Sequence, residues 1–316
     1  MRNVYTSRQL AEIFLASSSP KRSLGQNFII DDKVINSIYE LAQLEKKNNC
    51  KILEIGLGPG ALTQKLLESE NKVVGVEIDN LVCKHISQIF RKEIESGNLE
   101  LINGDVLDLK WPNGITDIIA NIPYQISSPL LEKISHIVYN DNNLKNCIFM
   151  FQEEFAQRIY VGKFISNRGP LWISVSLDWD ITLGIKIPPS SFMPQPKVHS
   201  RLVHLKRRDL LNSEKVKSFL KSKNLKTPSV RLIKAISFTS FNQRRKKLRN
   251  TLRRQPTKLK IRHGFNPKDW EKIINNAFLS MREFFSDCRP EELSLMDWIE
   301  FSAQIDHFKN FYQTST

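Results

Sequence analysis

Between residues 51 and 150 the chain alternates short β-branched runs with helical patterns, and this alternation limits the possible folds more than any other feature. Apolar residues at helical spacing occupy 60–69, 80–96 and 128–139. The intervening runs, bounded by Gly, Asn or Asp, predict strands: KILEIGLG (51–58), KVVGVEI (72–78), LELINGDV (99–106), TDIIANI (116–122) and CIFMF (147–151). Repeated strand and helix indicate an α/β fold with a parallel sheet covered on both faces.

The flanking segments extend this pattern. Residues 31–44 predict a helix capped by Asp31 or Asp32. Every odd position from 173 to 187 is apolar, which locally predicts a strand or a pair of strands, and four prolines in 188–196 predict an extended segment. After about Lys206 the pattern is helical and basic. We therefore expect an N-terminal arm (1–24), a catalytic domain (25–205) and a basic helical domain (206–316).

Charge is distributed unevenly along the chain. The formal net charge is +14. Residues 1–200 hold 21 Lys plus Arg and 22 Asp plus Glu, a net of −1, and residues 201–316 hold 26 and 11, a net of +15. A neutral body with a cationic appendage predicts a polyanionic partner, either nucleic acid or an acidic membrane. The hydrophobic fraction of 41% is enough for real cores.

Localisation and metal content are predicted from simpler features. No run approaches the roughly 18 apolar residues of a membrane span. The first residues lack a secretory pattern, with an organellar transit peptide as the less favoured alternative. Four scattered cysteines and six histidines have no metal-ligand spacing. We expect no metal site and reduced thiols in a cytoplasmic protein.

A glycine-rich turn, E-I-G-L-G-P-G-A (54–61), follows the first predicted strand. Glycines at Gly56 and Gly58 suit a nucleotide-like ligand lying against the backbone, although a tight turn without a ligand is the alternative. Glu77 ends the next strand, where a carboxylate can accept hydrogen bonds from ribose hydroxyls or simply lie on the surface. Together they favour an adenosine-type ligand but leave NAD and S-adenosylmethionine open.

Two further signals separate these cofactors. Asp105, in N-G-D-V, can bind an adenine amino group or form a turn. The fourth strand ends in Asn121-Ile122-Pro123-Tyr124. A nucleobase amine is a poor nucleophile, and two acceptors aimed at its hydrogens favour the pyramidal geometry that it needs. Asn121 offers one acceptor, the backbone carbonyl of Ile122 or Pro123 offers the other, and the Tyr124 ring can stack on an extruded base. A turn with a buried Tyr is the alternative.

Five segments in this order resemble the ribosomal RNA adenine dimethyltransferase family, from about Arg8 to about Gln304. They are S-L-G-Q-N-F (23–28), E-I-G-L-G-P-G (54–60), N-I-P-Y (121–124), P-P-S-S-F-M-P-Q-P-K-V (188–198) and F-N-Q-R-R-K-K-L-R-N (241–250). The resemblance implies a Rossmann-like, seven-stranded methyltransferase sheet with a small C-terminal helical domain. It also implies a helix at 173–179, against the local alternation, and we follow the family there. The stretch N-R-G-P-L-W-I-S-V (167–175) departs from the family pattern.

The resemblance also implies S-adenosyl-L-methionine as cofactor and a role for each matching position. Tyr124 and Phe192 would sandwich the target adenine, although Phe192 could instead be a core aromatic. The expected cofactor contacts are Asn27 and Ile29 closing over it, Gly56 and Gly58 in the turn, Glu77 and Ile78 at the ribose, Asp105 and Val106 at the adenine, and Asn121 at both cofactor and target amine.

The basic region suggests how RNA is held. Residues 201–262 contain 21 Lys plus Arg against two acidic residues, a net of +19. In F-N-Q-R-R-K-K-L-R-N-T-L (241–252), one helix would place Phe241, Leu248 and Leu252 on one face. Five cations between 244 and 249 should repel one another without a polyanion, although a solvated helix is the alternative. The candidate RNA contacts are Arg244, Arg245, Lys246, Lys247 and Arg249.

We therefore expect a monomeric enzyme that dimethylates N6 of two adjacent adenosines near the 3′ end of small-subunit (16S) ribosomal RNA and contributes to ribosome biogenesis. The number of methyl groups and bases comes from the family resemblance alone. The alternatives are a methyltransferase of large-subunit RNA of the macrolide-resistance type and a non-catalytic nucleic-acid-binding or transcription factor on the same fold. An NAD oxidoreductase lacks a hydride-transfer constellation.

Overall fold

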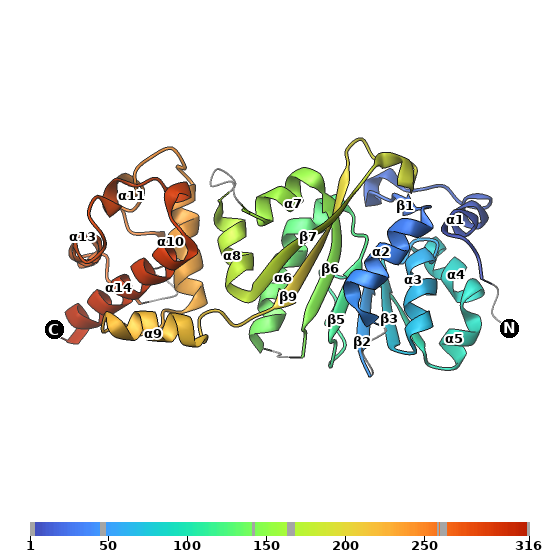
Figure 1. Cartoon of the computed structure of the whole chain (residues 1–316), viewed down its shortest axis with the longest axis horizontal. Helices are drawn as coiled ribbons and strands as arrows, with labels where there is room; N and C mark the ends of the chain where they lie inside the picture. The colour runs from blue at the N-terminus through green and yellow to red at the C-terminus, as the bar shows by residue number, and fades with distance from the viewer. Residues whose placement is uncertain are drawn as a thin grey trace. The chain divides into compact units, whose positions relative to one another are not determined.

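The computed structural model describes residues 4–44, 49–140, 143–162, 168–257, 259 and 264–314 (Figure 1). Internal contacts divide the chain into two compact units. Unit 1 comprises Met1–Ala156 with Asp180–Arg207, and unit 2 comprises Gln157–Trp179 with Arg208–Thr316. This division differs from the one expected at residue 205, because a segment before it groups with the C-terminal helices. Each unit is described separately below.

Unit 1 contains a seven-stranded sheet in the order β4-β3-β2-β5-β6-β9-β7. The strands are β2 (Lys51–Ile55), β3 (Lys72–Glu77), β4 (Leu99–Asn103), β5 (Asp117–Ala120), β6 (Asn146–Gln152), β7 (Trp179–Ile187) and β9 (Ser200–Arg207). The pairs from β4 through β6 are parallel, and β9 joins β6 in the antiparallel direction. All residues of β5 are buried, as a parallel strand covered on both faces requires. The predicted α/β class and its first five strands are confirmed.

Helices precede, connect and follow the parallel strands of unit 1 (Figure 1). They are α1 (Ser7–Leu15), α2 (Asp32–Ala42), α3 (Ala61–Leu66), α4 (Asn80–Ile89), α5 (Arg91–Glu95), α6 (Ser127–Asn140) and α7 (Glu153–Ile159). The Asp31 side chain caps α2 by accepting the Lys33 N–H at 3.0 Å. Outside the main sheet, β1 (Phe28–Ile29) pairs with β8 (Phe192–Met193), which follows the short 3-10 helix η6 (Pro189–Ser191). This pairing brings the first family segment beside the fourth.

The alternating segment 173–187 divides into two structures. Residues Trp179–Ile187 form strand β7, as its alternation predicts. Residues Pro170–Asp178 form helix α8, so the strand prediction is wrong there and the family-based helix is confirmed. Pro170 lies in the first helical turn, where its missing N–H costs nothing, and burial of Ile173, Val175 and Ser176 on several sides of α8 hides the helical period. Strand β9 was not predicted. Prolines precede it and cations occupy its last positions, so its apolar run is short.

In the described part of unit 2, the regular secondary structure is helical, apart from Trp179, the first residue of β7. With α8 it contains α9 (Glu214–Ser222), α10 (Val230–Phe241), α11 (Leu248–Thr251), α13 (Trp270–Leu279) and α14 (Leu295–Thr314). Its core is built around the fully buried Trp298 and Phe301, and it includes Ile173 and Leu177 of α8.

The two units differ in charge. Unit 1 holds 21 Lys plus Arg and 21 Asp plus Glu, and unit 2 holds 26 and 12, so the entire net charge of +14 belongs to unit 2. None of the described helices is long and apolar enough to cross a membrane.

Candidate active site

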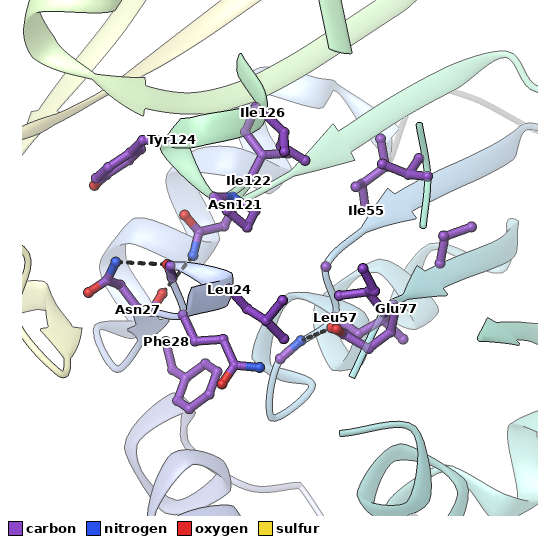
Figure 2. Close-up of a pocket in the computed structure, with 18 of the residues that line it drawn as sticks. Leu24, Asn27, Phe28, Ile55, Leu57, Glu77, Asn121, Ile122, Tyr124 and Ile126 are labelled. Atoms are coloured by element: carbon purple, nitrogen blue, oxygen red, sulfur yellow. Dashed lines mark hydrogen bonds between the residues drawn. The ribbon is translucent and has the colours of Figure 1, made fainter. Parts of the chain in front are cut away.

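A cavity of about 310 Å³ lies at the carboxyl edge of the sheet in unit 1 (Figure 2). Its walls come from the segment before α2, the glycine turn after β2, the ends of β3 and β5, and the turn after β4. The strand order reverses direction between β2 and β5, and open α/β sheets bind ligands at such a switch point. The volume falls in the range of small-molecule sites, about 300–1,000 Å³.

The glycine turn forms the floor of this cavity. Gly56 and Gly58 have φ values of 73° and 52°, in the left-handed region that a side chain rarely adopts. Both line the cavity. Gly60 has a different role, because a Cβ there would lie 2.5 Å from the Phe90 ring. The turn therefore presents bare backbone to a ligand at two positions and packs on α4 at the third.

Glu77 is fixed beside the turn at the end of β3. Its Oε1 accepts the Asp79 N–H at 2.9 Å. Its Oε2 accepts the Gly58 N–H at 3.3 Å (Figure 2). Burial raises the pKa of this carboxyl above its ordinary 4.5, and the two N–H donors oppose that rise. Because Glu77 also lines the cavity, it offers a preoriented acceptor to ligand hydroxyls.

A strap formed by residues 21–29 closes one side of the cavity. Asp79 accepts a hydrogen bond from Lys21 Nζ at 2.7 Å and one from Gln26 Nε2 at 2.9 Å. Burial alone would raise the pKa of Asp79, but these two donors and the Lys21 charge lower it below its ordinary value. The strap also carries Asn27 and Ile29, both of which line the cavity. No local sequence pattern marks these tethers, because Asp79 shows only the pattern of a helix N-cap.

Asn121 and Tyr124 form a further part of the cavity wall, and Asn121 contacts the strap. Asn121 Nδ2 donates to the Asn27 carbonyl at 2.9 Å, which directs its Oδ1 away from the strap and toward the Tyr124 side (Figure 2). The Tyr124 hydroxyl shares a 2.7 Å hydrogen bond with Ser200 Oγ of β9. Burial raises the pKa of Tyr124, so this phenol stays protonated at neutral pH. Ser200 is fully buried and was not among the residues predicted for the site.

The backbone between these two side chains supplies a second acceptor. The Pro123 carbonyl accepts the Ile126 N–H at 3.1 Å at the start of the 3-10 helix η4 (Tyr124–Ile126). Within the described part of the chain, no backbone hydrogen bond reaches the Ile122 carbonyl. From the sequence, the carbonyl of either Ile122 or Pro123 could be the second acceptor. The Ile122 carbonyl is the more available of the two for a hydrogen bond from a ligand.

The structure brings together nearly all predicted site residues. Asp105 lines the cavity but also accepts the Leu107 N–H at 2.8 Å, so it forms the turn that was its alternative role. Phe192 is the exception: its side chain is 1% exposed, belongs to the main core and does not line the cavity. The predicted residues on the cavity wall are Asn27, Ile29, Gly56, Gly58, Glu77, Ile78, Asp105, Val106, Asn121 and Tyr124.

The basic segment of unit 2 is not one helix. Helix α10 ends at Phe241 and α11 begins at Leu248, with a turn between them, so the prediction of a continuous amphipathic helix over 241–252 is wrong. Phe241, Leu248 and Leu252 still reach one core, but from two elements. Lys258, Lys260 and Arg262 of the predicted basic region, and Asn167 of the divergent stretch, lie outside the described residues.

Carboxylates neutralise part of this basic segment. Arg244 pairs with Glu291, and Asp287 pairs with both Arg249 and Lys247, the latter at 3.2 Å. The expectation of unrelieved repulsion is therefore wrong for three of the five cations. Arg245 and Lys246 are exposed and form no ion pair within the described ranges. No group of three or more His, Cys, Asp or Glu is placed to hold a metal ion among the residues described.

Comparison with known proteins agrees with this geometry. Residues 17–270 match the family model described as ribosomal RNA adenine dimethylase. The chain is 35% identical to the ribosomal RNA small subunit methyltransferase A of Mycoplasmopsis synoviae, over 78% of this chain and 86% of that protein. The corresponding protein of Prochlorococcus marinus (strain MIT 9515) is 32% identical over 89% and 94%.

A solved structure supports the same relationship. The dimethyladenosine transferase of Plasmodium falciparum superimposes with a TM-score of 0.68 at 26% identity, covering 86% of this chain and 95% of that one. The 23S rRNA methyltransferase ErmE shares the fold, with a TM-score of 0.58 at 20% identity over 89% of this chain and 100% of its own. With a family model that spans most of the sequence and relatives above 30% identity, the chain belongs to the ribosomal RNA adenine dimethylase family.

Proposed function

We propose that this protein transfers methyl groups from S-adenosylmethionine to N6 of adenosines in small-subunit ribosomal RNA, two on each of two adjacent bases near the 3′ end. One observation carries the proposal: Asn121 and Tyr124 share a single cavity with the glycine turn and Glu77. The cavity thus combines acceptors for a nucleobase amine with a surface for an adenosine-type cofactor.

The residues present fit S-adenosylmethionine. Gly56 and Gly58 line the cavity with bare backbone, and their left-handed φ values disfavour any side chain there. Glu77 would accept the ribose hydroxyls, and the free oxygen of Asp105 would accept the adenine amine. Asn27 and Ile29 would close over the cofactor, with Ile78 and Val106 against its base. When bound, the cofactor supplies a methyl group on a cationic sulfonium, so the reaction needs no metal.

The chain's own residues would prepare the target amine. Because Asn121 Nδ2 is occupied by the Asn27 carbonyl, its Oδ1 is the atom free to accept an amine hydrogen. The Ile122 carbonyl would accept the second hydrogen, which favours the pyramidal nitrogen that can attack a methyl group. The Tyr124 ring would stack on the extruded adenine, and the hydrogen bond of its hydroxyl to Ser200 anchors the end of the side chain.

Unit 2 would hold the RNA through phosphate contacts. It carries the whole net charge of +14, and Arg245 and Lys246 are exposed. Such contacts position a substrate but do not read its sequence. The choice of adenosine would therefore depend on the cavity and the shape of the RNA. We further propose that the protein acts as a monomer on the immature small subunit, and hence in the cytoplasm.

A methyl-transfer assay with both ribosomal subunits tests the substrate. Purified protein is incubated with labelled S-adenosylmethionine and immature small or large subunits, and the modified adenosines are mapped. We expect label only in small-subunit RNA. Label only in large-subunit RNA would favour the macrolide-resistance class, whose ErmE member shares the fold. No label in either RNA would favour a non-catalytic RNA-binding protein.

Asn121→Ala tests the acceptor role. Loss of one preorganised hydrogen-bonding group in an active site costs roughly 100- to 1,000-fold in kcat. We expect turnover to fall by about this factor while the cofactor still binds measurably. Asn98→Ala, at an exposed position away from the cavity, is the matched control. Near-normal turnover of Asn121→Ala would refute the acceptor role.

A further inference from the structure

Phe284 is an aromatic residue in an unfavourable position. Its side chain is 72% exposed, so it contributes little to the core of unit 2. Its backbone has φ 58° and ψ 12°, in the left-handed region, which is uncommon for a bulky residue. Neither burial nor backbone preference explains a phenylalanine here, where glycine would fit the turn better. Strained, exposed residues of this kind concentrate at functional sites.

Phe284 lies in a loop that is fastened to the basic segment. The Phe284 carbonyl accepts the Asp287 N–H at 2.9 Å, which closes the turn leading into the 3-10 helix η7 (Phe285–Asp287). The Leu248 N–H donates to the Cys288 carbonyl at 2.9 Å, joining this loop to the start of α11. The exposed ring therefore belongs to the same part of unit 2 as the turn between α10 and α11.

Asp287, three residues after Phe284, also holds two cations of the basic segment. It pairs with Lys247 at 3.2 Å and with Arg249, both of which remain about half exposed. Residues 242–249 and 280–292 together contain seven Lys or Arg and four Asp or Glu, a net of +3. The surroundings of Phe284 are thus cationic, although carboxylates order the cations. An exposed ring beside ordered cations is the combination by which proteins bind single-stranded nucleic acid.

We propose that Phe284 is a stacking platform for an unpaired base of the RNA, with Lys247 and Arg249 on the phosphates that flank this base. The proposal rests on the proposed function for the class of partner. An unpaired base is favoured because the faces of paired bases in a helix are covered by their neighbours, whereas a loop or single strand leaves a face free. Arg282, two residues before Phe284, is 56% exposed and pairs with Asp297 at 3.8 Å, so it is a further cation that a carboxylate orders.

Phe284→Gly in the full-length protein is the central test. Glycine removes the ring and also suits the left-handed backbone, so the melting temperature should not fall. Binding is measured with a fluorescently labelled single-stranded oligoribonucleotide and no cofactor. Loss of one stacked base should weaken affinity about 5- to 140-fold. Phe284→Trp should retain the affinity, and Leu279→Ala, at a residue 82% exposed nearby in sequence, is the matched control.

Salt dependence separates stacking from charge. Phe284→Gly should weaken binding by the same factor at each salt concentration, because the ring releases no counterions. Lys247→Gln should reduce the slope of log affinity against log salt by about one. An oligonucleotide of the same length with abasic positions should bind wild type and Phe284→Gly with similar affinity.

Two results would overturn the proposal. One is equal affinity of wild type and Phe284→Gly for the base-bearing oligonucleotide. The other is normal binding of Phe284→Gly to naked RNA with weakened binding to the assembled subunit, which would mean that the ring docks on a protein. The binding assay involves no methyl transfer, so it is independent of the proposed activity. A protein that transfers no methyl group but still needs Phe284 to bind RNA would refute the proposed function and still support the stacking site.

Discussion

Glu54 is a buried carboxyl directly beneath the candidate active site, and replacing it with glutamine should stabilise the protein. It lies in β2 two residues before Gly56 and has no exposed surface. Neither of its oxygens has a hydrogen-bond partner of good geometry among the described residues. Burial raises the pKa of Glu54 from 4.5 to about 8; Thr63 opposes this rise and the charge of Glu77 adds to it.

The sign and size of the effect follow from proton binding. Between pH 4.5 and about 8 the unfolded chain releases a proton that folded Glu54 keeps, so the stability of the wild type falls as the pH rises. A rise in the pKa of Glu54 from 4.5 to about 8, at 1.36 kcal/mol per pH unit, lowers the stability of the wild type by about 5 kcal/mol above pH 8 and by about 3 kcal/mol at pH 7. Glu54→Gln keeps the shape of the side chain and cannot ionise, so it should lose this dependence.

Urea unfolding of the cofactor-free protein at pH 5, 7 and 9 measures the effect. The stability of Glu54→Gln relative to wild type should increase by about 3 kcal/mol or more from pH 5 to pH 9. Glu100→Gln, at an exposed position on β4, should follow wild type at every pH. The reasoning is refuted if Glu54→Gln and wild type show the same pH dependence, because the buried carboxyl would then be ionised in the folded state.

Three further predictions concern the cavity. Ser200→Ala leaves the Tyr124 hydroxyl without its partner, which costs about 1–3 kcal/mol, and should lower methyl transfer more than cofactor affinity when both are measured. Asp79→Asn removes the charge that holds Lys21, and calorimetry should show weaker cofactor binding; unchanged affinity would mean that the strap closes without this tether. Cofactor affinity should fall at acid pH as Glu77 gains a proton, with a midpoint above pH 4.5 because its pKa is raised, and Glu77→Gln should abolish this acid limb.

The cofactor side of the cavity could be predicted because its signals are local. A glycine turn that follows a strand, and a carboxylate that ends the next one, reach the same edge of any parallel sheet. Gly56, Gly58 and Glu77 therefore line the cavity as the sequence indicates. The strand and helix alternation from 51 to 151 likewise depends on neighbouring residues, and the structure confirms it.

The remaining features depend on contacts between distant residues. Ser200 orients Tyr124 from 76 positions away, and no local pattern marks it. Burial of Phe192 follows from the pairing of β8 with β1, and the sequence of the proline-rich segment does not predict this contact. Likewise, the single helix predicted for the basic segment fails because its apolar residues reach the core from two elements. Periodicity cannot detect a turn placed within an otherwise helical pattern.

The discontinuity of unit 2 determines the order in which the chain can fold during synthesis. Ile173 and Leu177 leave the ribosome first, and Trp298 and Phe301, which share their core, follow roughly 120 residues later. Helix α10, which packs on α8, is made before them, but the core that these helices share stays incomplete, and so open to aggregation or chaperone binding, until Trp298 and Phe301 follow. A fragment that starts at residue 206 would lack these two core side chains permanently. The basic unit is therefore better obtained by joining 157–179 to 208–316 with a short linker than by truncation.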